Sequence, residues 1–409
     1  MKLTFLGTAS CFPTPSRGVS CIALTLDEGS IWLFDCGEGS QIQLQKCPNL
    51  RAGKVKKIFI THLHGDHLFG LPGLLCTLGN GCDANDERLV CIYGPCGLRK
   101  YLLTSLEISR SIPNLKFSIH EMMPKENQFP PDWCEWNTDL EYSGQSASRL
   151  GESSYTKIYP TKQSYDSFTT GSRTNEGNEC ENKGHTGQRN SIMYWELSDS
   201  IESSYCVKAG ALKHRIPSFG FVIKEFDKPG KLNAAKLQLD FDLKPGPIFG
   251  QIKSGKVIVL ENGMKIDCDK YLGPSIKGRK ISIFGDTCDS SELESLSQNS
   301  DLLVHESTME NSLSAKAIEY GHSTPEMAAK FAHCSGAKRL CLTHVSPRYK
   351  PQPKNGDSET NNESHKDLEQ SLTATILQKE AEQYLRDINC DMEVIIADDF
   401  LVVPVPKCT

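Results

Sequence analysis

Residues 61–67 read THLHGDH, and they directly follow the apolar run KKIFI of residues 56–60. A short apolar run of this kind is typical of a buried β-strand, so we expect the polar stretch in the loop where that strand ends. Four potential metal ligands fall within this loop: His62, His64, Asp66 and His67. Neutral imidazoles and carboxylates are ligands that Zn²⁺ prefers. A single histidine is often an ordinary core residue, but this spacing favours a metal site.

Other potential ligands also follow strand-like runs. His214 comes after VKAGALK, Asp286 ends ISIFGD, and His344 ends RLCLTH. One loop cannot close a tetrahedral site, and the carboxyl ends of strands in an α/β sheet gather at one edge, so we expect these side chains to complete the site. The number of ligands suggests two metal ions bridged by one carboxylate. Two ions about 3.5–4 Å apart can activate water and bind both oxygens of a phosphoryl transfer.

The composition narrows the class of protein. The chain has 409 residues, of which 38% are hydrophobic and 23% charged, as in ordinary globular proteins. No apolar run approaches the roughly 18 residues needed to cross a bilayer, so we expect no contact with a membrane. Seventeen scattered cysteines without a CxxC pair suit reduced thiols, and the N-terminus lacks the pattern of a signal peptide or presequence. We therefore expect a cytoplasmic or nuclear protein.

Strand-like and helical runs alternate through most of the chain, which predicts an α/β fold in one domain over residues 1–409. Residues 124–204 are instead rich in Gly, Ser and Asn, so we expect a polar and mobile surface insertion there. Residues 224–256 contain two Pro-Gly turns and a short helix but too few apolar residues to form a core. We expect this segment to project from the body of the protein.

Several stretches of the chain are similar to a known family. THLHGDH resembles the signature of the metallo-β-lactamase superfamily, and a larger set of stretches resembles the short form of ribonuclease Z, the tRNA 3′-processing endonuclease. These stretches are TFLGTASCFPTPSRG, WLFDCGEGSQIQL, IFITHLHGDHLFGLPGLL, HRIPSFGF, PGKLNAAKL, PGPIFG, FGDT, GHSTPEMAA and LTHVSPRY. They extend from residue 3 to about residue 350 and are more specific than the histidine cluster, which many hydrolases share.

The resemblance implies a metallo-β-lactamase fold, which is a four-layer αβ/βα sandwich, and two Zn²⁺ ions per chain. One ion would be held by His62, His64 and His214, and the other by Asp66, His67 and His344, with Asp286 bridging both. Asp66 would also act as the general base, because a carboxylate beside an activated water can accept its proton.

The family match also assigns a general acid. His322 of GHSTPEM would contact the phosphate and protonate the leaving oxygen, oriented by Glu306 of HEST. Without the match, His322 could equally be a plain residue of the loop before a helix.

The implied reaction removes the 3′ trailer from precursor tRNA. The cut would fall 3′ to the discriminator nucleotide, leaving a 3′-hydroxyl on the tRNA and a 5′-phosphate on the trailer. Residues 224–256 resemble the flexible arm with which the family grips tRNA, and their seven lysines outnumber four acids. The implied substrate-binding residues are Arg17, Lys228, Lys231, Gly246 and Pro247. Family members of this form are homodimers in which the arm of one subunit serves the active site of the other.

One departure and two alternatives remain. The family loop P-x-K-x-R-N reads PTPSRG here, with Pro15 in place of Lys and Gly18 in place of Asn, which puts discrimination against mature CCA ends in doubt. A dinuclear metallo-hydrolase could instead act on a small phosphodiester or ester. A noncatalytic RNA-binding scaffold is a further alternative, although it would be expected to have lost a ligand.

Overall fold

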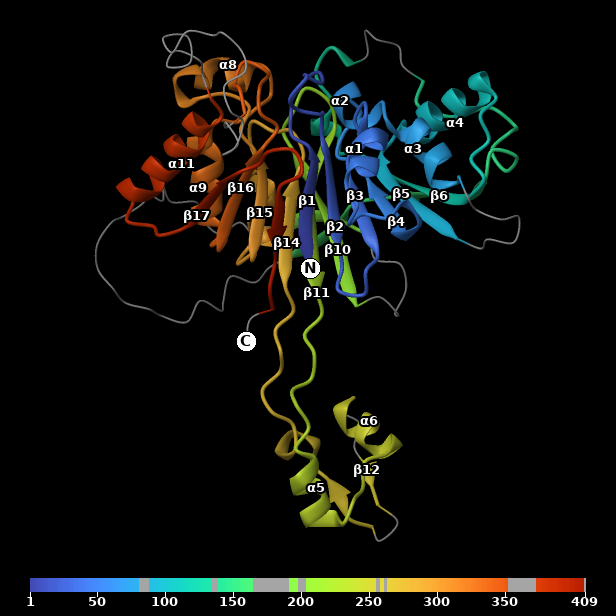
Figure 1. Cartoon of the computed structure of the whole chain (residues 1–409), viewed down its shortest axis with the longest axis vertical. Coiled ribbons are helices and arrows are strands. Elements are labelled where there is room, and N and C mark those ends of the chain that lie inside the picture. Colours follow the sequence, from blue (N-terminus) through green and yellow to red (C-terminus); the bar gives the residue numbers. More distant parts are fainter. Residues whose placement is uncertain are drawn as a thin grey trace.

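Two eight-stranded sheets form the centre of the molecule. The computed structural model describes residues 1–80, 88–133, 139–164, 191–197, 204–254, 258–260, 263–351 and 373–407. Figure 1 shows the two sheets face to face, with helices on their outer sides and a narrow arm projecting from one end.

The first sheet is built mainly from the N-terminal half. Its strands, in spatial order, are β18 (Val402–Pro404), β1 (Lys2–Gly7), β2 (Cys21–Thr25), β3 (Ile31–Phe34), β4 (Val55–Phe59), β5 (Leu89–Pro95), β6 (Lys116–Met122) and β7 (Glu152–Ile158). The pairs from β3 to β7 are parallel, and the pairs from β18 to β3 are antiparallel.

The second sheet has the same mixture of strand directions. Its strands, in spatial order, are β17 (Glu393–Ile396), β16 (Arg339–Thr343), β15 (Leu302–Glu306), β14 (Lys280–Phe284), β11 (Ser218–Glu225), β10 (Tyr205–Leu212), β9 (Ser191–Glu196) and β8 (Thr161–Ser164). The pairs from β14 to β17 are parallel, and those from β14 to β8 are antiparallel.

Helices cover the outer faces of both sheets. The first sheet carries α1 (Ser40–Lys46), α2 (Gly65–Leu68), α3 (Leu71–Leu78) and α4 (Leu98–Ser109), and the second carries α7 (Glu294–Ser297), α8 (Ser314–Glu319), α9 (Pro325–Cys334) and α11 (Thr375–Asp387). Short 3₁₀ turns lie at Ala52–Lys54, Glu126–Gln128, Ser291–Leu293 and Asn311–Leu313. None of the helices in the described ranges is both long and apolar enough to cross a bilayer.

Three apolar cores match this layering. The central core joins the inner faces of the two sheets, where Phe59 of β4 meets Phe221 of β11 with ring centroids 5.3 Å apart. A second core lies under α3 and α4, and a third lies under α9 and α11. Sheets buried on both faces need such near-continuous apolar strands. The predicted αβ/βα sandwich of the metallo-β-lactamase fold is confirmed.

Part of the predicted insertion is not a loop. Within residues 124–204, β7 extends the first sheet, whereas β8 and β9 extend the second. Trp195 of β9 is fully buried in the central core, and its indole N–H donates to the carbonyl of Met123 at 3.0 Å. Strands at sheet edges tolerate polar residues on their exposed faces, which concealed them in the sequence. The most polar stretch, residues 165–190, lies outside the described residues.

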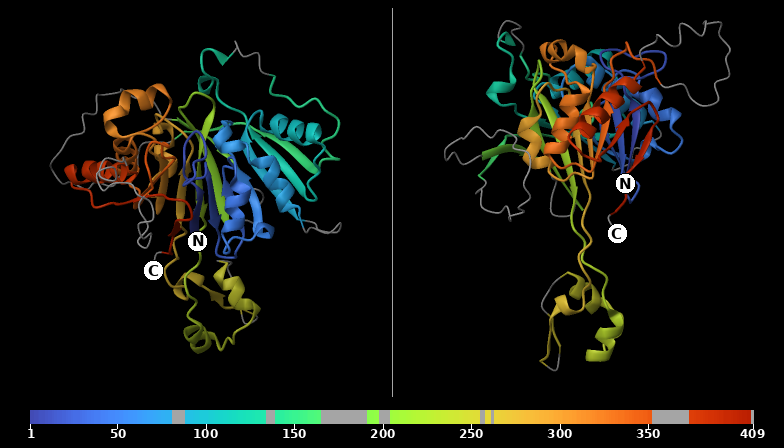
Figure 2. Two further views of the ribbon diagram at one scale, coloured as in Figure 1. Left: turned by 45° about the horizontal axis from the view of Figure 1, so that its top comes forward. Right: turned by 90° about the vertical axis from the view of Figure 1, so that its left-hand side faces the viewer.

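The arm extends further than the sequence suggested. It leaves the body after β11 and returns before β14, so that it spans residues 226–279 rather than ending at residue 256. It contains α5 (Ala234–Phe241), α6 (Pro247–Lys253), the pair β12 (Ile258–Val259) and β13 (Lys265–Ile266), and a 3₁₀ turn at Cys268–Lys270. The right-hand view of Figure 2 shows the arm standing clear of the body.

The arm also has its own small core, contrary to expectation. The buried members are Leu237, Ile252, Ile258, Ile266, Cys268 and Tyr271. Four of the six come after residue 256, which is why residues 224–256 alone contain too little apolar surface. β12 and β13, which lie within residues 258–266, belong to this arm.

Candidate metal centre

The loop after β4 places four side chains at the carboxyl edge of the first sheet. Thr61 is fixed first, since its backbone N–H and its hydroxyl both donate to the carboxylate of Asp35 at 2.7 and 2.9 Å. The chain then turns directly into α2, which contains Asp66 and His67. This sharp change from strand to helix turns His62, His64, Asp66 and His67 toward one region.

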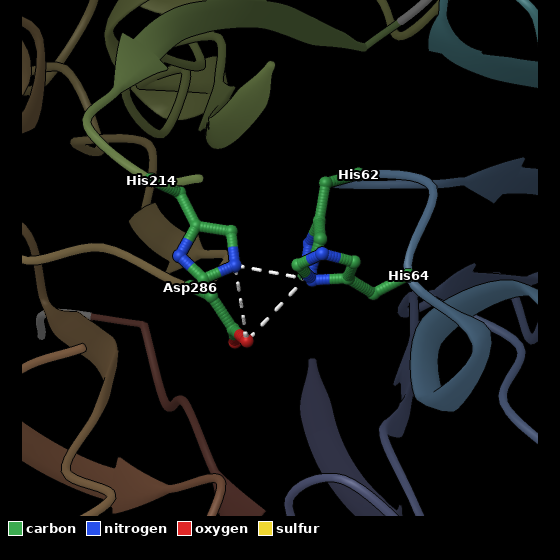
Figure 3. Close-up of side chains that lie close together, drawn as sticks. All are labelled: His62, His64, His214 and Asp286. Carbon is green, nitrogen blue, oxygen red and sulfur yellow. Dashed lines mark hydrogen bonds and ion pairs between the residues drawn. The ribbon is translucent and has the colours of Figure 1, made fainter. Parts of the chain in front are cut away.

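One group of potential ligands joins both halves of the chain. Nδ1 of His64 lies 3.1 Å from Nε2 of His62 and 3.1 Å from Nε2 of His214, which follows β10. Oδ2 of Asp286, just after β14, lies 3.6 Å from Nε2 of His62 and 4.0 Å from Nε2 of His214. Figure 3 shows these four side chains pointing toward one another.

A second group lies beside the first. Nε2 of His67 and Nε2 of His344, which follows β16, are 3.1 Å apart. Oδ2 of Asp66 is 3.6 Å from Nε2 of His67 and 3.3 Å from Nε2 of His344. The other oxygen of Asp286, Oδ1, is 3.5 Å from Nε2 of His67. The structure thus brings all seven predicted ligands together, with Asp286 between the two groups.

The donor set fits two bound cations. Oδ1 of Asp286 is buried and has no hydrogen-bond partner among the described residues. An unpaired buried carboxylate oxygen is costly, so its position between two groups of nitrogen and oxygen donors is explained if a cation binds there. Imidazole nitrogens with carboxylates suit zinc.

Hydrogen bonds from the outer side orient the histidine rings. Nδ1 of His214 donates to the carbonyl of Gly321 at 2.7 Å, which directs its Nε2 lone pair into the centre. Nδ1 of His67 lies 2.7 Å from Asp35, and Nδ1 of His344 lies 3.0 Å from the hydroxyl of Thr308. Such partners of the second ring nitrogen fix the tautomer that binds metal.

Two of these orienting residues, Asp35 and Thr308, were not predicted from the sequence. Asp35 directly follows β3, so it has the same position at a strand end as the potential ligands, and that signal was available in the sequence. Thr308 donates to Glu306 at 2.7 Å and thereby links that carboxylate to His344. Its role depends on β15 and β16 being neighbours, which the sequence does not show.

The electrostatics also suit cation binding. Burial lowers the pKa of His64 to about 3 and that of His214 to about 4, so both rings are neutral at neutral pH, the form that binds metal. Burial opposes the charge on His67 too, but the carboxylates of Asp286, Asp35 and Asp66 outweigh burial and raise its pKa. Carboxylates that hold a proton so firmly also attract a metal ion, which would replace that proton.

His322 and Glu306 form a buried pair beside this centre. Nδ1 of His322 lies 3.0 Å from Oε1 of Glu306 and 3.7 Å from Oδ2 of Asp286. Burial favours the neutral ring, but the Glu306 carboxylate outweighs burial and raises the pKa of His322 to about 9. Glu306 in turn accepts hydrogen bonds from the backbone N–H groups of Thr287 and Thr308. The Glu306 carboxylate therefore favours the protonated form of the His322 ring.

The centre opens into a cleft of about 300 Å³. Besides ligands and His322, the cleft is lined by Cys11, Pro13, Val19, Glu38, Gly65, Phe69 and Arg215. The backbone N–H of Cys11 donates to Oδ2 of Asp66 at 2.7 Å, so the loop of residues 10–18 closes one side. Of these lining residues, only Pro13 belongs to a stretch, the PTPSRG loop, that the resemblance connected with the choice of substrate. A substrate can reach the metal-binding donors through the open mouth of this cleft.

The predicted substrate-binding residues lie elsewhere. Arg17 is only 2% exposed, and it donates to Thr8 and forms an ion pair with Asp398. Its guanidinium thus holds the loop in place, and no direct contact with a substrate is supported. Exposed positions on the arm, remote from the metal centre, are occupied by Lys228, Lys231, Gly246 and Pro247.

Comparisons with known proteins identify relatives of nearly the same length as this chain. Zinc phosphodiesterase ELAC protein 1 of Homo sapiens is 39% identical to the chain over 415 residues, which cover 99% of each protein. Ribonuclease Z of Prochlorococcus marinus is 33% identical over 399 residues, which cover 97% of this chain and 99% of that protein. The profile of the family described as Anti-Pycsar protein Apyc1 matches residues 1–81.

A solved structure extends the comparison to three dimensions. The crystal structure of human tRNase Z, short form, superimposes with a TM-score of 0.58 and 30% identity, covering 99% of this chain and 100% of that chain.

Proposed function

Because the chain belongs to the ribonuclease Z family of zinc phosphodiesterases, we propose that it is an endonuclease that removes 3′ trailers from precursor tRNA. Its family consists of hydrolases, which argues against the noncatalytic scaffold. The observation that most supports the proposal is that two adjacent donor groups and the His322–Glu306 pair surround one open cleft.

Two zinc ions per chain are part of the proposal. One would be held by His62, His64 and His214, the other by Asp66, His67 and His344, and Asp286 would bridge them. When bound, zinc lowers the pKa of water toward neutrality and stabilises charge on phosphate oxygens.

Asp66 is the proposed proton acceptor. Burial raises the pKa of its carboxyl, but His67 and His344 outweigh burial and keep the pKa below its ordinary value. The carboxylate therefore remains ionised at neutral pH. It lines the cleft at the metal centre, where an attacking water must lose a proton.

His322 is the proposed proton donor. It lines the same cleft, and Glu306 keeps its ring protonated, so it can protonate an oxygen that leaves phosphorus. In the proposed reaction, water attacks the phosphorus, the bond to the ribose 3′-oxygen breaks, and that oxygen receives a proton. The cut 3′ to the discriminator nucleotide, with a 3′-hydroxyl on the tRNA, follows the family reaction.

The position of the arm is an argument for a large substrate and for a second subunit. It begins where β11 ends and returns where β14 begins, whereas His214 precedes β11 and Asp286 follows β14. The arm and the metal centre are therefore at opposite ends of the same strands, about 25 Å apart for eight residues of strand. An arm so placed points away from its own cleft, so we propose a homodimer in which it holds tRNA for the partner.

One assay tests the proposal directly. Purified protein is incubated with a 3′-extended precursor tRNA, with and without a chelator, and the cut is mapped at nucleotide resolution. We expect one metal-dependent cut after the discriminator nucleotide. Cleavage of bis(p-nitrophenyl) phosphate without any cut in the precursor would instead favour a small-molecule hydrolase, which has no use for the arm.

A further inference from the structure

An aromatic side chain stands at the entrance of the cleft. Phe69 lies between α2 and α3, lines the cleft beside His64 and Arg215, and is 61% exposed. Single exposed apolar residues are common on protein surfaces and need no explanation by themselves. The position of this ring, within two residues of His67 in the sequence, sets it apart from the other exposed apolar side chains.

The backbone around Phe69 is held firmly on both sides. The N–H of Phe69 donates to the carbonyl of Gly65 at 2.9 Å, and the N–H of Gly70 donates to the carbonyl of Cys36 at 2.9 Å. Because Cys36 lies next to Asp35, the segment is tied to the same strand end that orients the metal centre. The backbone that carries the ring is therefore fixed before any substrate arrives.

Gly65 provides the seat for the ring. A Cβ atom at residue 65 would lie 2.3–2.7 Å from three ring carbons of Phe69, so only glycine lets the ring lie against the backbone between His64 and Asp66. Tyr101 of α4 stacks beside the same ring, with centroids 6.2 Å apart and planes inclined by 22°. Gly65 of THLHGDH thus leaves room for the Phe69 ring and also allows the turn into α2.

The chemistry of this corner suits an unpaired nucleobase. An aromatic ring with most of its surface free can stack on any base, because every base has a π-face. Arg215 is exposed and lines the same cleft, so its guanidinium can contact a phosphate next to that base. Single-stranded nucleic acid is commonly bound by this combination of a cation and a stacking ring.

We propose that Phe69 is a stacking platform for one unpaired base directly next to the phosphate that is cut. This inference rests on the proposed function, because it needs a single-stranded RNA segment in the cleft. It makes Phe69 a positioning residue: the stacked base fixes the nucleotide, and thereby the scissile bond, against the metal centre.

The test compares removal of the ring with removal of the base. Phe69→Leu keeps apolar bulk but has no π-face, so shielding of the centre from water is preserved. Two precursor tRNAs carry an abasic ribose, one at the discriminator and one at the first trailer nucleotide. We expect Phe69→Leu to lower kcat/KM on intact substrate by about 5- to 100-fold, as expected for one stacked base. On one of the two abasic substrates, the same substitution should have almost no further effect. Equal losses on all three substrates would overturn the proposal.

Two further variants complete the design. Phe69→Trp should restore cleavage, since a larger ring stacks at least as well. Ile108→Ala removes another exposed apolar side chain, 79% exposed on α4 and outside the cleft, and should not alter cleavage.

A direct probe separates this proposal from the proposed function. A 2-aminopurine base at either position loses fluorescence when it stacks, and its fluorescence and cleavage are followed in one reaction with enzyme in excess. Quenching by the unsubstituted protein but not by Phe69→Leu supports the platform, even if no cut occurs and the proposed function fails. Cleavage with identical quenching by both proteins overturns the platform and leaves the proposed function intact.

Discussion

The body and the arm are built on different principles. The body encloses an apolar core between two sheets, and the potential metal ligands lie just beyond the ends of its strands, two of them in the short helix α2. The arm has a core of six buried side chains and joins the body through a neck with two isolated bridges, Lys228 to Ile276 and Leu232 to Leu272. In the neck Gly230 lies so close to its neighbour that a Cβ would meet the carbonyl oxygen of Gly273 at 2.0 Å.

This difference suggests that the body carries out the reaction and that the arm binds the tRNA. The ligand positions in the body must be fixed within fractions of an ångström, which requires a large packed core. A contact with tRNA backbone tolerates a looser support, because phosphates are bound mainly by charge. Substitutions at the metal centre should therefore affect every substrate, whereas changes in the arm should affect only large ones. The following predictions test that separation.

Asp286→Ala should have the largest effect. It removes the one carboxylate shared by both donor groups, so we expect loss of bound zinc and loss of activity on both precursor tRNA and bis(p-nitrophenyl) phosphate. Metal analysis and both assays measure this, with the exposed Asp391→Ala as a matched control. Full zinc content in the Asp286→Ala protein would contradict the bridging role.

Removal of the arm should separate the two activities most clearly. Asp227 and Lys277 already form an ion pair of 2.9 Å across the neck, so a short Gly-Ser linker can replace residues 228–276 without moving the strands. We expect cleavage of precursor tRNA to disappear and turnover of bis(p-nitrophenyl) phosphate to continue. Undiminished cutting of the precursor by the armless protein would show that the arm is not needed to bind the tRNA.

His322→Ala should retain zinc and lower kcat by about 10²- to 10⁴-fold, the usual contribution of a general acid. Zinc content is the decisive measurement, because His322 also lies within reach of Asp286 and His344 as a possible third donor group. Loss of one zinc ion per chain in this variant would make His322 a ligand instead of an acid.

Glu306→Gln should change the pH dependence. The carboxylate raises the pKa of His322 to about 9, and a raised pKa keeps the ring protonated until the pH passes that value. Without the charge the pKa falls, so the decline of kcat/KM with rising pH should begin at lower pH than in the unsubstituted protein. An unchanged basic limb would show that His322 does not determine it.

Lys231→Ala should have the smallest effect. Lys231 is exposed on the arm, and loss of one phosphate contact should weaken binding of all precursor tRNAs uniformly and reduce the salt slope by about one. Titrations at several salt concentrations measure this slope. Lys379→Ala on α11 is the control. An equal change in the salt slope of that variant would show that the effect comes from the net charge of the surface and not from a contact made by Lys231.

The sequence by itself determined the family and the types of the potential ligands, and it placed them in the stretches that follow apolar strands. Local pattern suffices for these, because an apolar strand followed by His or Asp is visible within a few residues, as in residues 56–67. It also determined the alternation of strands and helices, since hydrophobic periodicity is a local property.

Only the tertiary structure decided which distant residues support the site and how far the arm extends. Asp35 contacts His67 and Thr308 contacts His344 across more than 30 residues of chain, and no local pattern shows which strand ends become neighbours. Arg17 matched a family motif yet is buried against Asp398, which lies far away in the chain. The arm core depends on residues beyond 256, because burial is created by side chains that meet only after folding.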